Sequence, residues 1–104
     1  MAYWYVETWT VLREKLEEHE VALKRWTDYL LPRLKAGNYW YLWNRQGPIG
    51  GRIFIKEFEN FTHFENTMEV MNRDEENIKL RGAWRSCIDT GSWRSTFWSK
   101  MAVK

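Results

Sequence analysis

Cysteine and histidine are scarce in this chain, and their scarcity limits the chemistry that it can carry. The 104 residues include one cysteine and two histidines. A single cysteine, Cys87, cannot form an internal disulfide, so we expect a reduced, cytoplasmic setting. Cys87, His19 and His63 lie too far apart in the sequence to form a zinc-binding motif. We therefore predict neither a metal site nor a bound cofactor.

Long apolar runs, targeting segments and phosphate-binding motifs are also lacking. No apolar run approaches the ~18 residues of a membrane span, and the stretch MAYWYVETW lacks the basic and apolar regions of a signal peptide. The glycines of residues 46–51 form neither a Walker motif nor a dinucleotide-binding motif. The net charge of +2, from 16 basic and 14 acidic residues, is too balanced to indicate a nucleic-acid or membrane partner.

Aromatic residues, by contrast, are abundant. The chain has 8 Trp and is 17% aromatic, and a chain of this length, which fits one domain over residues 1–104, buries only roughly 65% of its unfolded surface. Four of the five residues from Tyr39 to Trp43 are aromatic. A strand with one wet face should alternate apolar and polar residues, and this segment does not. Both of its faces should therefore be covered.

Hydrophobic periodicity divides the chain into strands and helices. Four segments rich in β-branched and aromatic residues predict strands: 3–11, 38–45, 52–58 and 93–99. Residues 12–36 predict a long helix, because apolar residues recur at spacings of three and four. Pro32 predicts a kink or an early end of this helix, and Gly37 predicts its stop. Glu20 and Lys24 have the spacing of an i,i+4 ion pair.

The second helical region is predicted in two parts. Thr62 and Glu65 have the spacing of a capping box, and apolar residues follow them at helical spacing. After Asn72 a second segment is predicted from about 74 to 88. The order strand, helix, strand, strand, helix, strand is the ferredoxin-like pattern of α+β proteins. It places both helices on one face of a four-stranded antiparallel sheet and leaves the other face bare.

The alternation within each strand gives two candidate faces. The more apolar set is assigned to the helices: Trp4, Val6, Trp40, Leu42, Ile53, Ile55, Trp93 and Phe97. The mixed set is assigned to the bare face: Tyr5, Glu7, Trp9, Tyr39, Tyr41, Trp43, Arg52, Phe54, Lys56, Arg94 and Trp98. An exposed aromatic patch of this size is a liability for a soluble monomer, so we expect a partner or a ligand to cover it.

This layout resembles the dimeric α+β barrel proteins, which include antibiotic-biosynthesis-type monooxygenases and NIPSNAP-like proteins. The resemblance covers nearly the whole chain and rests on an aromatic first strand, a long first helix, a hairpin, a second helix broken at 72–74, and a short last strand. It implies a homodimer in which two sheets face each other, with a pocket between sheet and helices or within the barrel. Haem-degrading members use an Asn on the first strand, which this chain lacks, so that activity is disfavoured.

Two residues are candidates for catalysis. Glu7 is either a general base in an aromatic pocket or one half of an inter-strand or inter-subunit ion pair with Arg52, Lys56 or Arg94. His63 is either a general base at the mouth of the pocket or an exposed residue of a first helical turn. Cofactor-independent oxidation of an electron-rich aromatic molecule is the chemistry that the resemblance implies.

The candidate ligand-binding residues come from the mixed set. They are Tyr5, Trp9, Tyr39, Tyr41, Trp43, Arg52, Phe54, Arg94 and Trp98. We expect one connected cavity, lined by Tyr5, Glu7 and Tyr41, that binds a small apolar or aromatic molecule. Two alternatives stay open: a structural or interaction module without catalysis, and RNA binding in which Phe54 and Phe58 stack on bases.

Overall fold

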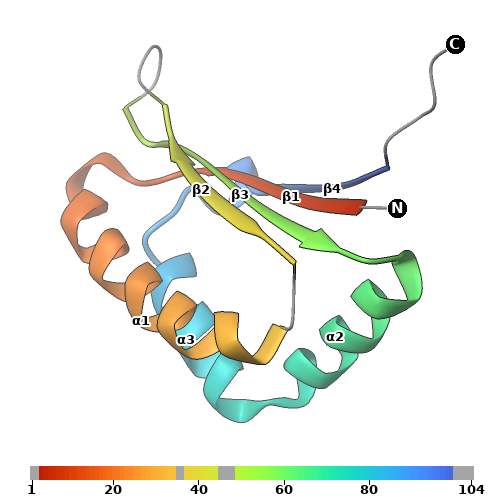
Figure 1. The fold of residues 1–104 in the computed structure, drawn as a ribbon. Coiled ribbons are helices and arrows are strands. Elements are labelled where there is room, and N and C mark those ends of the chain that lie inside the picture. The colour runs from red at the N-terminus through yellow and green to blue at the C-terminus, as the bar shows by residue number, and fades with distance from the viewer. Residues whose placement is uncertain (1–2, 35–36, 45–48, 100–104) are drawn as a thin grey trace, which may run out of the picture.

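The computed structural model describes residues 3–34, 37–44 and 49–99. Strands and helices follow the order β1 (Tyr3–Thr10), α1 (Leu16–Leu34), β2 (Tyr39–Trp43), β3 (Gly51–Phe58), α2 (Phe61–Arg73), α3 (Glu75–Arg85) and β4 (Arg94–Ser99). Short 3-10 turns, η1 (Arg13–Lys15) and η2 (Thr90–Ser92), precede α1 and β4. The four strands form one antiparallel sheet in the order β2-β3-β1-β4. All three helices lie on one side of it (Figure 1), which confirms the ferredoxin-like α+β prediction.

Helix α1 buries the stripe that its spacing predicted. Leu23, Leu30 and Leu34 are buried against the sheet and α3, together with the intervening Trp26. The helix passes through Pro32 and continues to Leu34, so it does not end at the proline; the kink that was the other expectation stays a prediction. Pro32 lies in the last turn, where the loss of one backbone hydrogen bond weakens the helix little.

The broken second helix is confirmed, but its start differs from the prediction. The helix begins at Phe61, and the side chain of Asn60 caps it by accepting a hydrogen bond of 2.8 Å from the His63 N–H. Thr62 therefore lies inside the first turn, so the predicted capping box is wrong. Asp74 ends α2 and caps α3, since its carboxylate accepts from the Asn77 N–H at 3.1 Å. One carboxylate thus holds the corner between the two helices.

The predicted assignment of the strand faces is wrong for β1, β2 and β3. Burial in β3 falls on Arg52, Phe54, Lys56 and Phe58, and the strand register aligns these with the mixed residues of β1 and β2. The helix-covered face therefore carries Tyr5, Glu7, Trp9, Tyr39, Tyr41, Trp43, Arg52, Phe54 and Lys56. The open face carries Trp4, Val6, Trp40, Leu42, Ile53 and Ile55. In the last strand region the assignment is correct: Trp93 and Phe97 face the helices, and Arg94 and Trp98 lie on the open face.

Pairing of charges explains this reversal. Glu7 and Lys56 are buried beneath the helices as an ion pair, with 2.9 Å between Glu7 Oε1 and Lys56 Nζ. Arg52 is buried beside the Glu20 carboxylate of α1, with 2.9 Å between its Nε and Oε1. Buried charges are tolerated when they are paired, so a mixed face can lie in the interior. Counting apolar residues could not reveal these partners.

Candidate functional site

A chain of hydrogen bonds links the sheet to α1 at its β2 side. The Trp9 indole Nε1–H donates to His19 Nε2 at 3.0 Å, and His19 Nδ1 lies 3.0 Å from Glu20 Oε1. An indole nitrogen only donates, so His19 Nε2 is the unprotonated nitrogen and Nδ1–H donates to the carboxylate. His19 is fully buried. Its ring therefore fixes the orientation of Glu20.

Glu20 collects donors from three elements. Besides His19, it accepts from Arg52 Nε of β3 at 2.9 Å and from the Tyr41 hydroxyl of β2 at 3.1 Å. Burial alone would raise the pKa of Glu20, but the hydrogen bonds from His19 and Arg52 outweigh burial and lower it. Burial and the Glu20 charge raise the pKa of Tyr41. At neutral pH the site thus holds a carboxylate beside a protonated phenol.

This carboxylate lies in a groove between α1 and β2, which we call the α1–β2 groove. Its volume is about 480 Å³. Its lining is mostly apolar and aromatic: Glu20, Leu23, Lys24, Thr27, Leu31, Tyr39, Tyr41, Trp43 and Phe54. Four predicted ligand-binding residues, Tyr39, Tyr41, Trp43 and Phe54, therefore meet here. A groove of this size accommodates a molecule of a few fused rings.

Glu7 lies in a separate, much smaller space, which we call the inner chamber. Its volume is about 40 Å³, and it is lined by residues of β1, β3 and the three helices. The Glu7 carboxylate accepts from Lys56 Nζ at 2.9 Å and from the Trp93 indole N–H at 3.2 Å. Tyr5 lines the same chamber, where burial and the Glu7 charge raise its pKa. The geometry matches the inter-strand ion pair that was one of the two interpretations of Glu7.

The single connected cavity predicted for Tyr5, Glu7 and Tyr41 is therefore wrong. Two rings, those of Trp26 and Phe54, lie between the groove and the chamber, with 5.8 Å between their centroids. Trp9 is also part of the packed interior, since its ring lies 4.6 Å from that of Trp84. The large aromatic residues of the helix-covered face fill the space that a common cavity would need.

Other predicted residues lie away from both spaces. His63 lies in the first turn of α2, where its Nδ1 accepts from the Glu59 N–H at 3.3 Å and its ring packs edge-on against Phe58. Arg94 uses its guanidinium to bind the carbonyl oxygens of Gly91 and Trp93 at 2.8 Å. Phe54 and Phe58 are 1% exposed. Neither ring can stack on RNA bases, so the predicted RNA-binding residues are wrong.

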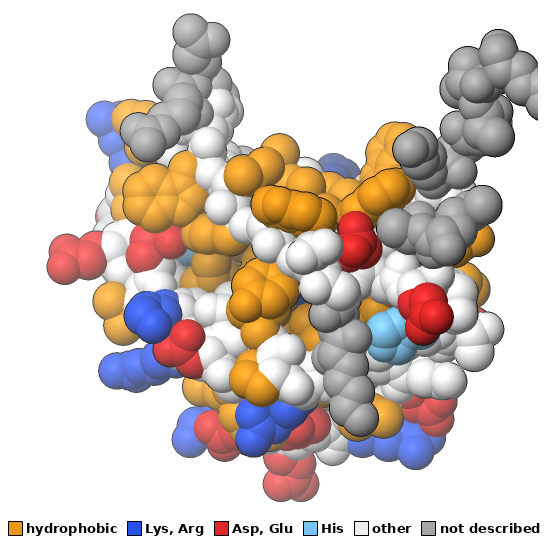
Figure 2. Space-filling view, viewed as in Figure 1, with side chains coloured by type: hydrophobic (Ala, Val, Ile, Leu, Met, Phe, Trp, Pro, Cys, Tyr) orange, Lys and Arg blue, Asp and Glu red, His pale blue; other side chains and the backbone are white. Residues whose placement is uncertain are grey.

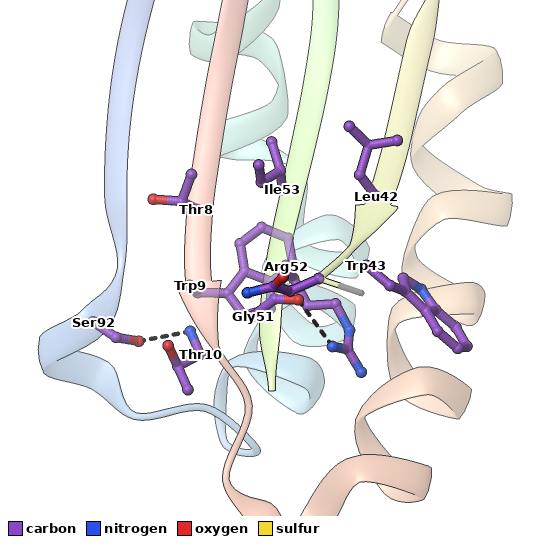
Figure 3. Close-up of a pocket in the computed structure, with 10 residues that line it drawn as sticks. Thr8, Trp9, Thr10, Leu42, Trp43, Gly51, Arg52, Ile53 and Ser92 are labelled. Carbon is purple, nitrogen blue, oxygen red and sulfur yellow. Dashed lines mark hydrogen bonds between the residues drawn. The ribbon is translucent and has the colours of Figure 1, made fainter. Parts of the chain in front are cut away.

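The open face of the sheet has a hollow of its own at the end nearest η2. Its volume is about 580 Å³. Figure 3 shows Leu42, Ile53 and Thr8 side by side on neighbouring strands, in agreement with the strand register. Beside them, the Ser92 hydroxyl accepts from the Thr10 N–H at 2.8 Å.

Large apolar side chains dominate the open face. Trp40, Leu42, Ile53 and Trp98 are all exposed on it. Figure 2 shows hydrophobic side chains gathered along the sheet side of the molecule, whereas Lys, Arg, Asp and Glu lie mainly over the helices. Such a patch is typical of an interaction surface.

Two residues of the groove network escaped the sequence analysis. His19 was considered as a zinc ligand, and Glu20 was expected to pair with Lys24. In the structure Lys24 pairs with Asp28 at 2.9 Å, which leaves Glu20 to Arg52. The only signal in the sequence was a His-Glu pair at the edge of an apolar helical stripe, next to buried positions.

Residues 3–34, 37–44 and 49–99 contain neither a candidate metal site nor a helix that could span a membrane. No group of three or more His, Cys, Asp or Glu in these ranges is arranged to hold a metal ion. None of the described helices has both the length and the apolar character needed to cross a lipid bilayer.

Comparison with known proteins identifies the fold. The sequence matches no protein-family model and no curated protein. A NIPSNAP family protein from Agrobacterium tumefaciens is 12% identical with a TM-score of 0.82, over 99% of this chain and 89% of that one. A conserved protein from Methanosarcina mazei is 15% identical with a TM-score of 0.78, over 97% and 94%. SnoaB from Streptomyces nogalater, described as a cofactor-independent oxygenase, is 12% identical with a TM-score of 0.75, over 98% and 95%. The chain therefore has the α+β fold of NIPSNAP proteins and SnoaB, as the predicted resemblance implied.

Proposed function

We propose that this protein binds a small aromatic molecule in the α1–β2 groove. The observation that carries the proposal is the combination of aromatic walls with one oriented carboxylate in a space of about 480 Å³. Tyr39 and Trp43 stand at the exposed rim, and Phe54 closes the floor. Ligand sites commonly combine a largely apolar lining with a few placed polar groups.

The polar anchor of this site is Glu20. Its carboxylate is held ionised by His19 and Arg52, so it only accepts hydrogen bonds. The preferred ligand should therefore donate one, as a phenol or an indole does. A hydrogen bond to a charged group contributes about 1.5–3 kcal/mol, which corresponds to at least about tenfold in affinity.

The experiment is a calorimetric titration with two matched probes, 1-naphthol and 1-methoxynaphthalene. The two share the ring system, but only 1-naphthol donates a hydrogen bond. We expect 1-naphthol to bind at least about tenfold more tightly. Equal affinities would remove Glu20 as the anchor, and no binding of either probe up to their solubility limits would contradict the proposed site.

Substitution of two almost equally exposed tryptophans tests where the ligand binds. Trp43 is 56% exposed at the groove, and Trp98 is 57% exposed on the open face. Trp43→Ala should weaken 1-naphthol binding about tenfold, because it removes one aromatic wall. Trp98→Ala should leave the affinity unchanged. The reverse pattern would move the ligand to the open face.

Oxidation of the bound molecule is the second candidate function. The observation that favours it is the shared fold with SnoaB, described as a cofactor-independent oxygenase. A hydroxyarene and O₂ would give a quinone and water, with the hydroxyl proton passing toward the Glu20 carboxylate. Oxygen uptake measured with 1-naphthol in metal-free buffer tests this chemistry. Uptake equal to that of protein-free buffer would leave binding as the function.

We also propose that a second copy of the chain covers the open face. The described residues of that face carry only two charged side chains, Glu57 and Arg94, among large apolar ones. The Glu57 carboxylate is engaged by the Trp4 indole N–H at 3.1 Å. A surface so low in charge has the character of a homodimer interface. If this face instead binds RNA, the protein should stay monomeric and should bind a labelled single-stranded RNA.

A further inference from the structure

The inner chamber between the sheet and the helices is rich in hydrogen-bond donors and poor in acceptors. Lys56, Arg81 and Arg85 contribute N–H groups to its walls, whereas Glu7 is the one carboxylate. Both ends of the Asn77 side-chain amide already make hydrogen bonds: its Oδ1 accepts from the Trp26 indole N–H at 2.8 Å, and its Nδ2 donates to the Met71 carbonyl at 2.9 Å. An occupant of this chamber must therefore act mainly as an acceptor.

Two of these donors have unused capacity. The Lys56 ammonium has three N–H groups, of which one donates to Glu7 Oε1 at 2.9 Å. The same nitrogen otherwise faces rings, at 5.0 Å from the Phe54 centroid and 5.1 Å from that of Trp26. Within the part of the chain that the structure describes, Arg85 Nε is buried and has no hydrogen-bond partner. A buried N–H without a partner destabilises the folded state, so an acceptor here would stabilise the protein.

The charges that line the chamber also favour an occupant that accepts hydrogen bonds. Three cations and one carboxylate line the chamber, and the Arg81 guanidinium is occupied by Asn72 Oδ1 at 3.0 Å. Arg85 Nη2 lies 4.0 Å from Glu7 Oε2, which leaves its charge only loosely compensated. Burial, followed by the nearby Arg81 charge, lowers the pKa of Arg85. The Lys56 side chain is 3% exposed and the Arg85 side chain 39%, so the excess positive charge lies at a partly buried site, where an anion would compensate it.

We propose that the inner chamber binds one compact monoanion, a halide or a carboxylate of formate size, between Arg85 Nε and Lys56 Nζ. The volume of about 40 Å³ sets this limit, because a single water needs roughly 10–15 Å³ by the same kind of measure and an aromatic acid needs far more. The site is separate from the α1–β2 groove, since Trp26 and Phe54 lie between them. It does not depend on the function proposed for that groove.

The direct test is a crystal structure of the full chain grown in potassium bromide, with anomalous data collected at the bromine edge. We expect an anomalous peak inside the chamber within about 3.5 Å of Arg85 Nε and Lys56 Nζ. Water alone in the chamber, or bromide confined to the outer surface, would overturn the proposal.

A solution test uses thermal unfolding at constant ionic strength. Bromide and formate should raise the Tm by about 4 °C or more relative to sulfate, and benzoate should not. Arg85→Gln should remove this shift, whereas the matched control Arg25→Gln, an exposed arginine of α1, should keep it. The same Tm in all four salts, or a full shift in Arg85→Gln, would contradict the site.

Discussion

The two faces of the sheet differ in charge, and composition alone would predict the wrong face to be buried. The face under the helices carries Glu7, Arg52 and Lys56, all buried and all paired. The face without helices carries apolar side chains such as Trp40 and Leu42, which are exposed. Charge inside and apolar surface outside is the reverse of the usual distribution.

In this sheet, a side chain is buried where the interior offers it a partner. A charge enters an interior when an opposite charge and hydrogen-bond donors stand ready within it, as Glu20 does for Arg52. An apolar face stays uncovered within a monomer when another surface is available to it. The helix-covered face of this sheet therefore carries paired charges between aromatic walls, and the open face is the surface that we propose for association.

The largest effect should come from breaking the ion pair of the helix-covered face. Lys56→Met would leave the buried Glu7 carboxylate without its nearest cation, and we expect a loss of about 3–5 kcal/mol in the free energy of unfolding. Urea denaturation followed by tryptophan fluorescence measures the loss. The double variant Glu7→Gln with Lys56→Met should recover most of it. A single-variant loss below about 1 kcal/mol would contradict the buried pairing.

A smaller effect, confined to association, is expected on the open face. Leu42→Lys would place an unpaired charge within the proposed dimer interface and should weaken the dimer at least about 100-fold, with little change in the unfolding of the monomer. Val70→Lys, at an exposed apolar residue of α2, is the matched control and should leave the dimer intact. Size-exclusion chromatography with light scattering measures both. Equal behaviour of the two variants would argue against the open face as the interface.

The smallest expected effect is on the stability of the protein at acidic pH. The pKa of Glu20 in the folded protein lies below its ordinary value of 4.5. Its stabilising contribution is therefore present above about pH 4.5 and is lost as the pH falls through the folded pKa. Glu20→Gln should flatten the fall in unfolding free energy between pH 5 and pH 3, whereas the exposed control Glu65→Gln should follow the wild type. Parallel curves for Glu20→Gln and wild type would show that His19 and Arg52 do not hold the carboxylate ionised.

The order of elements was predictable because local periodicity determines it. The leucine spacing of α1 and the alternation within Gly51–Phe58 are local signals, and both produced the observed elements. The corner at Asp74 was also visible, since acidic residues follow a break in the apolar pattern. Boundaries were less accurate: Asn60, not Thr62, caps α2, because two polar residues competed for one cap.

The faces and the site were not predictable, because both depend on contacts between distant residues. Arg52 and Glu20 are separated by 32 positions and Lys56 and Glu7 by 49, and no local pattern announces either pair. Lys56 was one of three possible partners named for Glu7, but the mixed composition still placed Glu7 and Arg52 on the bare face. The role of Glu20 was missed for the same reason, because the sequence predicted an ion pair with Lys24 and not with Arg52.

Sedimentation velocity of the wild type, Trp43→Ala and Trp98→Ala at micromolar concentration tests the central claim that the two faces have different roles. The two tryptophans are almost equally exposed, at 56% and 57%, but lie on opposite faces. We predict a dimer for the wild type and for Trp43→Ala, and a roughly 30-fold weaker dimer for Trp98→Ala, corresponding to about 2 kcal/mol. A monomeric wild type, or a dimer that weakens with Trp43→Ala but not with Trp98→Ala, would contradict the account.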